Sequence, residues 1–240
     1  MSTELFDLYP NEYVVDLTFS DVRYIISPSY TENIHMKKFA SGISAGLLIS
    51  IGGSVYLSLC GENISKIFGA ILFSVALLCI CVKGYSLYTG RIGFLPFNHT
   101  KESISDLLLG LLGNLVATAA FGFMLSYSIS SLQSGALVIC EAKLTQPWWS
   151  ALLRAFMCGV LMYLAVSIYK EHGSFLGIFL CIPVFILSGF EHSIANMFYF
   201  SVARIISIEA CGYIWIVIAG NTLGAMFLPL INRSSKPKQN

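Results

Sequence analysis

Residues 187–197 read LSGFEHSIANM and place Glu191, His192 and Asn196 inside a stretch that is otherwise apolar enough to cross a membrane. Ionisable side chains at the depth of a bilayer are costly, and they commonly face the interior of a helix bundle and mark a functional site. We therefore interpret this cluster as the candidate functional site of the chain.

The composition of the whole chain indicates an integral membrane protein. Apolar residues make up 56% of the 240 residues and charged residues 11%, whereas about 25% of an ordinary soluble domain is charged. The length accommodates about six helical spans of about 20 residues each. The net charge of +1 and the lack of a basic patch with interleaved aromatic residues exclude nucleic acid as a partner. We expect an all-α, multi-pass membrane protein.

Apolar runs predict six transmembrane helices, of which the second and fifth are interrupted. The four continuous spans are 39–60, 104–130, 148–169 and 206–231. The second span starts near Ile67 and meets two glycines and two charged residues within 83–91. The fifth starts near Phe175 and meets Ser188–His192 before it resumes. Because glycines and charges interrupt an apolar helix, we expect both helices to break there.

Positions in the first three spans recur in the last three. The matched pairs, at offsets of 103, 107 and 113 residues, are Thr89 and His192, Asn114 and Asn221, and Gly46 and Gly159. Because each half contains three spans, the second half enters the membrane from the opposite side, and the halves form inverted repeats. Repeats of this kind place a binding site or pathway where the interrupted helices meet.

The distribution of basic residues predicts that both termini are cytoplasmic. With the amino terminus inside, nine Lys and Arg residues lie on the cytoplasmic side and three on the outer side, and cytoplasmic loops carry the excess of positive charge. We predict a cytoplasmic N-terminal segment (1–36), a single six-span domain (37–232) and a cytoplasmic tail (233–240). The N-terminal segment mixes apolar and acidic residues, which suits either a helix that covers the pore or an anchor at the membrane interface.

The interrupted spans suit the passage of an anion. Moving a bare monovalent anion into hydrocarbon costs on the order of 20 kcal/mol, so the protein must offset most of that cost. The N-termini of half-helices offer free N–H groups and a positive partial charge, and a histidine can donate a hydrogen bond or a proton. Our hypothesis is that His192, with Thr89 near the other break, shares a proton with a weak-acid anion, which then crosses as a neutral species.

Other functions find less support in the residues. An enzyme would need a nucleophile, a metal cluster or a cofactor motif, and the chain has neither His-Glu-x-x-His nor Gly-x-Ser-x-Gly. Cys79 and Cys81 point to different sides of a helix, which suits core packing, so we expect no metal and no cofactor. The alternatives left open are a proton-coupled secondary carrier and, more remotely, a structural or receptor protein in which His192 and Glu191 form a packing pair.

Several motifs resemble those of the formate/nitrite transporter family. They are GFEHSIANMF at 189–198, LYT at 87–89, GNL at 113–115 and GN at 220–221, and the resemblance extends from about Lys37 to Asn232. It implies an aquaporin-like protomer with six spans, the second and fifth interrupted, and a homopentamer in which each protomer has its own pore. It also implies conduction of small monovalent anions such as formate, nitrite or hydrosulfide across the lipid bilayer.

The resemblance implies a role for each matching residue. His192 matches the central pore histidine, Thr89 the threonine of the first interruption, and Lys143 a basic residue of the outer vestibule, whose charge would attract anions. The residues that match the outer constriction are Phe73, Leu77 and Phe185. Those that match the inner constriction are Leu87, Tyr88 and Met162. The expected supports of the broken helices are Glu191, Asn196, Asn114 and Asn221.

Four positions depart from the family pattern. Lys83 stands where a small or neutral residue is usual, Ser86 where an acidic residue is common, Tyr88 where phenylalanine is usual, and Gly159 where asparagine is frequent. The added positive charge near the inner slit favours hydrosulfide, with formate and nitrite as plausible substrates. Lys83 lines the pore in this interpretation; alternatively its side chain reaches the cytoplasmic interface. The constriction residues are also compatible with ordinary helix packing.

Overall fold

The computed structural model describes residues 28–59 and 63–234. The predicted N-terminal segment and C-terminal tail lie for the most part outside the described residues. Within them, the regular structure is helical throughout, which confirms the all-α prediction. The helices are α2 (Pro28–Leu59), α3 (Asn63–Lys83), α4 (Tyr88–Arg91), a 3-10 turn (Ile92–Phe94), α5 (Lys101–Ser128), α6 (Ser130–Leu144), α7 (Trp148–His172), α8 (Leu176–Leu187), α9 (Ser193–Ala203) and α10 (Ile208–Ser234).

The spans agree with the predicted ones. Within the described ranges, five helices are long and apolar enough to cross a membrane, at residues 34–59, 66–83, 101–128, 148–172 and 208–232. The remaining span consists of two short helices, α8 with 12 residues and α9 with 11. The second span is interrupted near its end, where α3 stops at Lys83 and the four-residue α4 begins at Tyr88. The protein is therefore a multi-pass membrane protein with the second and fifth spans broken.

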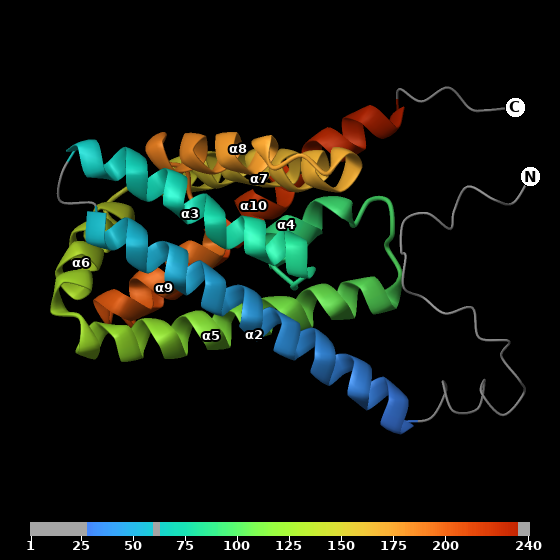
Figure 1. The fold of residues 1–240 in the computed structure, drawn as a ribbon, viewed down its shortest axis with the longest axis horizontal. Helices are drawn as coiled ribbons and strands as arrows, with labels where there is room; N and C mark the ends of the chain where they lie inside the picture. The colour runs from blue at the N-terminus through green and yellow to red at the C-terminus, as the bar shows by residue number, and fades with distance from the viewer. Residues whose placement is uncertain (1–27, 60–62, 235–240) are drawn as a thin grey trace, which may run out of the picture. The chain divides into compact units, whose positions relative to one another are not determined.

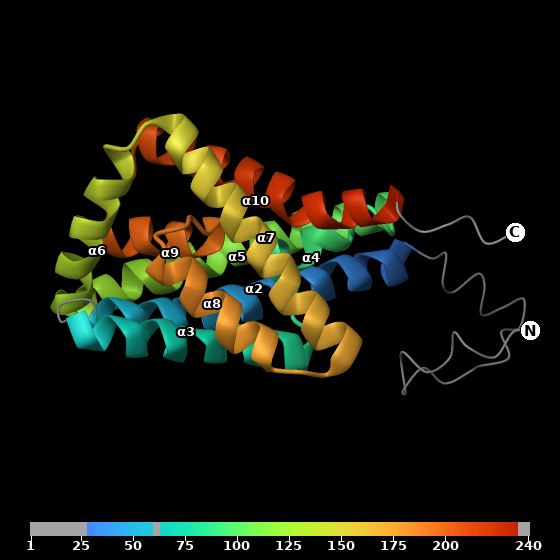
Figure 2. The ribbon, with the colours of Figure 1, turned by 90° about the horizontal axis from the view of Figure 1, so that it is seen from above.

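Within residues 37–240, the two halves run in opposite directions. α2 runs toward the end of the bundle that carries α6, whereas α7 starts at that end and runs away from it (Figures 1 and 2). In the same way, α3 runs away from α6 and α8 runs toward it. We call the end that carries α6 the outer end and the end at which α10 finishes the inner end. The opposite directions are those of an inverted repeat.

Close helix packing is also repeated between the halves. A Cβ atom added to Gly46 would lie 2.8 Å from the carbonyl oxygen of Asn114, and one added to Gly159 would lie 2.8 Å from the backbone nitrogen of Ala225. Real side chains are not tolerated at such distances, so both helices need glycine where their backbones meet. α2 therefore packs on α5 as α7 packs on α10, in agreement with the sequence offsets.

Helix α6 has no counterpart among the predicted spans. It follows α5 after the single residue Ile129 and lies across the outer end of the bundle (Figures 1 and 2). At 15 residues it is too short to span a bilayer, so hydropathy does not reveal it. Its position matters because it carries Lys143 to the interruption of the fifth span.

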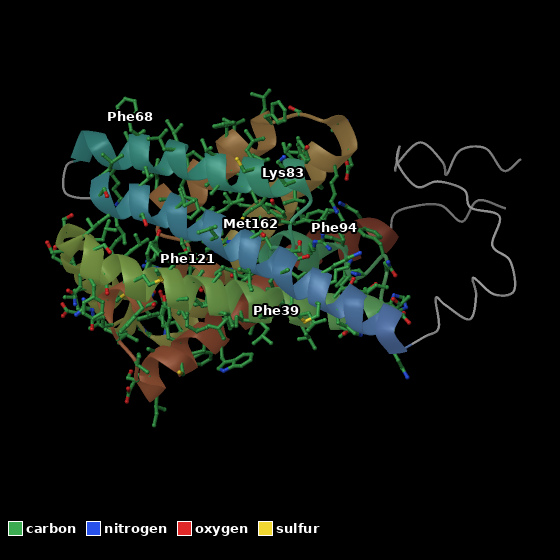
Figure 3. The ribbon with its side chains drawn as sticks, turned by 60° about the horizontal axis from the view of Figure 1, so that its bottom comes forward. Phe39, Phe68, Lys83, Phe94, Phe121 and Met162 are labelled. Atoms are coloured by element: carbon green, nitrogen blue, oxygen red, sulfur yellow. The ribbon has the colours of Figure 1, made fainter. Side chains whose placement is uncertain are left out.

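The outside of the bundle is apolar. On α3, Phe68, Leu72 and Val75 are 59%, 48% and 44% exposed, and Figure 3 shows Phe68 pointing away from the other helices. Met162, by contrast, is buried and lies between the helices (Figure 3). A continuous apolar face of this kind is rare on a soluble monomer and suits contact with lipid or with a partner subunit.

Candidate functional site

Each interruption of a span begins with the same helix-ending turn. Gly84 and Gly189 have φ values of +67° and +69°. In both turns, the residue after the glycine donates to the carbonyl five residues before it, at 3.0 and 2.9 Å, and the glycine donates to the carbonyl three residues before it, at 3.2 and 3.1 Å. This is the Schellman arrangement, in which the left-handed position is normally glycine because a Cβ atom is disfavoured there. The two breaks are therefore equivalent at an offset of 105 residues.

A short extended segment follows each turn and starts a new helix. Leu87 is the N-cap of α4, with φ −87° and ψ 120°, and His192 is the N-cap of α9, with φ −107° and ψ 117°. Leu87 is thus the structural equivalent of His192. Thr89 and His192, which the sequence pairs at an offset of 103 residues, contact each other across the two halves. The residue of the first half that is equivalent to His192 is Leu87, two residues before Thr89.

Asn114 binds the backbone of the first interruption. Its Oδ1 accepts a hydrogen bond from the N–H of Tyr88 at 3.0 Å, and its Nδ2 donates to the carbonyls of Gly42 at 2.8 Å and Ser86 at 3.0 Å. Asn114 is fully buried. Its amide therefore connects α2, α5 and the start of α4 and satisfies polar backbone groups that the break leaves free.

Asn221 binds the second interruption in the same way. Its Oδ1 accepts from the N–H of Ser193 at 2.8 Å, and its Nδ2 donates to the carbonyls of Ala155 and Glu191, each at 2.8 Å. Asn221 is also fully buried. The amide connects α7, α10 and the start of α9, and it fixes the backbone on both sides of His192.

His192 contacts the first interruption through its ring. Its Nδ1 accepts a hydrogen bond from the N–H of Ala195 at 3.1 Å, and its Nε2 lies 2.8 Å from Oγ1 of Thr89. Because a nitrogen that accepts a hydrogen bond carries no proton, we assign the proton of the neutral ring to Nε2, from which it is donated to Thr89. The ring of Phe185 stacks on His192 at a centroid distance of 5.7 Å and an interplanar angle of 19°. His192 and Thr89 are 3% and 1% exposed, so this contact is almost dry.

Glu191 is buried among donors from α6, from α9 and from the connection between α6 and α7. Lys143 of α6 forms an ion pair with its Oε2, Asn196 of α9 donates to the same oxygen at 2.8 Å, and Gln146 donates to Oε1 at 3.1 Å. A buried carboxylate is tolerated only when it is paired and hydrogen-bonded in this way. One cluster therefore contains the predicted vestibule residue Lys143 and the predicted supports Glu191 and Asn196. Gln146 also belongs to it, although nothing in the hydropathy pattern indicates this.

A cavity of about 280 Å³ lies on the outer side of His192. His192, Phe73 and Phe185 line it together. Three basic residues from separate places in the chain line the same cavity, and they are Lys66, Lys143 and Arg154. Glu191 also lines this outer cavity and pairs with Lys143, so Lys66 and Arg154 give the lining a net positive charge, which favours the approach of anions.

A smaller cavity of about 80 Å³ lies toward the inner end, and we call it the inner cavity. Leu77, Leu87 and Val166 form its apolar wall, and Arg91 and Lys170 also line it. Sequence reasoning missed both basic residues as site residues. Arg91 ends the segment 83–91 whose charges mark the first break, so a signal existed for it, whereas Lys170 looks like an ordinary charge at the end of a span.

Of the other predicted residues, only some line these cavities. Leu77 lines the inner cavity, although it was predicted with Phe73 at the outer constriction. Tyr88 and Met162 are buried but line neither of the two cavities, and the hydroxyl of Tyr88 hydrogen-bonds to Thr222 of α10 at 2.8 Å. Lys83 is exposed at the end of α3 and also lines neither cavity (Figure 3).

Comparison with known proteins identifies the family. The family model described as formate/nitrite transporter matches residues 30–232. The nitrite transporter NirC of Escherichia coli (strain K12) is 29% identical over 227 residues, which cover 84% of each chain. A solved structure described as an FNT family ion channel has a TM-score of 0.75 at 24% identity and covers 86% of this chain and 93% of its own. A pentameric formate channel with formate bound has a TM-score of 0.70 at 23% identity, with coverages of 85% and 98%.

The matched part of the chain includes the region that contains both interruptions. The two structural matches confirm the predicted aquaporin-like protomer fold. The match of the family model covers nearly the whole six-span region, including the cluster around His192. The chain belongs to the formate/nitrite transporter family.

Proposed function

We propose that the protein is a channel for small monovalent anions, with a path in each protomer that passes His192 and Thr89. The observation that carries the proposal is the 2.8 Å contact between Nε2 of His192 and Oγ1 of Thr89. His192 lines the outer cavity, and Leu87 and Gly90, close to Thr89 in the chain, line the inner cavity. The contact therefore joins the two interrupted spans at the place where the two cavities approach each other.

The chemistry of this contact suits a weak-acid anion. The neutral ring of His192 holds its proton on Nε2 and donates a hydrogen bond to Oγ1 of Thr89. The hydroxyl proton of Thr89 is therefore free to point at an anion. When an anion arrives, the ring of His192 and the anion together take up one further proton from the solvent on the outer side, so the pair is neutral and avoids most of the cost, on the order of 20 kcal/mol, of placing a bare charge in hydrocarbon. That further proton goes back to the solvent on the outer side when the anion leaves toward the inner cavity, so one negative charge is carried in total.

Hydrosulfide is the favoured substrate, and formate and nitrite are plausible. The departures at Ser86, Tyr88 and Gly159 support hydrosulfide, whereas Lys83, which is exposed and lines neither cavity, adds no support. At Gly159 the backbone of α10 leaves no room for a side chain, so the asparagine that is frequent in the family would not fit this packing. Formate and nitrite are supported by the similarity to a nitrite transporter and to a formate channel.

Flux measurements on purified protein in lipid vesicles test the proposal. Uptake of hydrosulfide, formate and nitrite is measured side by side, with and without an imposed proton gradient. Electrical current without a proton gradient supports a channel, whereas strictly proton-linked, electroneutral uptake supports the alternative, a proton-coupled secondary carrier of formate or nitrite. A lack of flux for all three anions would contradict both and leave a structural or receptor role.

The same proposal includes the assembly and its orientation. The similarity to a pentameric formate channel supports a homopentamer, whose contacts would cover part of the exposed apolar surface. The excess of Lys and Arg at the inner end supports cytoplasmic termini in a prokaryotic inner membrane. Chemical crosslinking of the protein in membranes tests the pentamer, and protease access to the C-terminal tail in sealed cells tests the orientation.

A further inference from the structure

We propose that the inner cavity binds a divalent oxyanion, such as sulfate or hydrogen phosphate, and that the bound dianion blocks conduction from the inner end. The starting observation is that Arg91 and Lys170 line the same small cavity. Among the residues that the structure describes, neither forms an ion pair with a carboxylate. The block rests on the proposed channel function, whereas the binding does not.

Both basic side chains are held in place without being neutralised. Nη2 of Arg91 donates to the carbonyl of Gly84 at 2.9 Å, and Nζ of Lys170 lies 4.1 Å from the ring centroid of Phe94. Figure 3 shows Phe94 at the inner end of the bundle, beyond α4. A carbonyl oxygen and the face of an aromatic ring fix the direction of a cation but leave its full charge. The two charges are therefore preorganised around the inner cavity.

Two lysines elsewhere in the bundle are paired with carboxylates. Lys38 pairs with Asp106 at 2.8 Å, and Lys143 pairs with buried Glu191. At the inner cavity, two positive charges share a space of about 80 Å³ and repel each other. An anion that enters this space relieves the repulsion, and this is the energetic basis of a binding site.

The charge balance favours a dianion over a monovalent anion. One monovalent anion would leave one of the two positive charges uncompensated, whereas a dianion compensates both. An oxyanion also has several acceptor oxygens, which match the forked donors of Arg91 and the ammonium of Lys170. Tyr85 and Tyr169 line the same cavity.

A bound dianion would not pass further. The deep wall of the cavity is formed by Leu77, Leu87 and Val166, which are 1%, 1% and 5% exposed. Because the Born cost grows with the square of the charge, a dianion costs about four times the roughly 20 kcal/mol of a monovalent anion in the same medium. One proton shared with His192 would neutralise formate or hydrosulfide but would leave hydrogen phosphate with a negative charge. The bound dianion therefore holds Arg91 and Lys170, the two cationic side chains that a conducted anion needs.

Binding is tested by thermal unfolding of the purified protein in detergent. Sulfate is titrated against chloride at equal ionic strength, and the part of the rise in Tm that saturates with sulfate is measured. We expect this saturable rise in the wild type and its loss in Arg91→Gln and in Lys170→Gln. Sulfate also stabilises folded proteins in general. This effect does not saturate and should be equal in the wild type and in all variants. Lys101→Gln, which removes an exposed lysine at the start of α5, is the matched control and should keep the saturable rise.

The block is tested by recordings of single insertions in planar bilayers, with sulfate added in turn to each compartment. We expect formate current to fall only when sulfate faces the inner end, and the half-blocking concentration to rise at least about tenfold in Arg91→Gln, equivalent to about 1.4 kcal/mol. Equal block from both compartments, or an unchanged saturable rise in Tm in both variants, would overturn the proposal. A saturable rise in Tm without flux of any small anion would reject the channel function and leave the binding site in place.

Discussion

Asn114 and Asn221 make the same three hydrogen bonds in opposite halves of the molecule. In each, the side-chain oxygen accepts from a backbone N–H at the start of a half-helix, and the side-chain nitrogen donates to two backbone carbonyls. The inverted repeat therefore extends to individual hydrogen bonds. At the offset of 105 residues, Ser86 stands in the place of Glu191 and Leu87 in the place of His192. The Glu191–His192 pair therefore has no ionisable counterpart at positions 86 and 87, and the first break supplies Thr89 to the contact.

Replacing either asparagine should destabilise the fold. Asn114→Ala and Asn221→Ala each leave buried backbone groups without a partner, at a cost of about 1–3 kcal/mol for each group. We expect a clear fall in the Tm of the purified protein in detergent for both variants. Asn98→Ala, at an exposed position before α5, is the control and should leave the Tm unchanged. An unchanged Tm in both buried variants would show that the breaks are held by other contacts.

Removing the ring of His192 should slow the flux and alter its pH dependence. His192→Asn keeps a side chain that can cap α9 but removes the donor to Thr89. Loss of a hydrogen bond to a charged group is worth about 1.5–3 kcal/mol, or about ten- to a hundredfold in rate. We expect such a fall in formate flux in vesicles, with a flatter profile between pH 5 and pH 8. Unchanged flux and pH profile would exclude a role for the ring in permeation.

The hydroxyl of Thr89 should matter separately from its size. Thr89→Val keeps the shape of the side chain but leaves the Nε2 proton of His192 without its 2.8 Å acceptor. We expect formate flux to fall about tenfold, with a smaller change in Tm, since one net hydrogen bond contributes about 1 kcal/mol. Thr145→Val, whose hydroxyl is exposed and bonds locally to Ala142, should behave like the wild type. Equal flux in both variants would rule out hydrogen bonding by Thr89 to the anion or to His192.

The ion pair between Lys143 and Glu191 should show strong coupling. Removing one partner of a buried pair costs about 3–5 kcal/mol, because it leaves an uncompensated buried charge. Lys143→Met should therefore lower the Tm more than the double variant Lys143→Met with Glu191→Gln. Thermal unfolding of the two single variants and the double variant gives the coupling as a double-mutant cycle. Additive changes in Tm would mean that the two charges do not depend on each other.

The left-handed glycine of the first break should be needed for function as well as for stability. Gly84 has φ +67°, and an added Cβ atom there would meet nothing within 4 Å, so Gly84→Ala introduces backbone strain of about 1–2 kcal/mol and little else. Gly173 has φ +63° and similar open surroundings between α7 and α8, which makes Gly173→Ala the matched control. We expect similar falls in Tm for the two variants but reduced flux only for Gly84→Ala. Equal flux in the two variants would show that conduction does not depend on the geometry of the break.

Local features of the sequence were sufficient to predict the spans and their breaks. Apolar runs locate the helices because each residue in a membrane contributes to the transfer free energy independently of its partners. Glycine and charge at 83–91 and 188–192 locate the interruptions because they act on the backbone of their own segment. The repeated Gly46 and Gly159, and Asn114 and Asn221, were also visible in the sequence. Their offsets differ chiefly because corresponding helices differ in length, with 21 residues in α3 and 12 in α8.

The rest depended on the packing of helices that are far apart in the chain. The contact of Thr89 with His192 joins residues 103 positions apart, and the pair of Lys143 with Glu191 depends on α6, which hydropathy does not detect. The exposure of Lys83, and the position of Arg91 and Lys170 in the inner cavity, depend on how each helix is rotated about its axis. The sequence by itself determined the number of spans, their breaks and the cluster at 187–197, because these follow from local free energies. Only the tertiary structure decided which charges are paired and which face a cavity, because that depends on distances between separate helices.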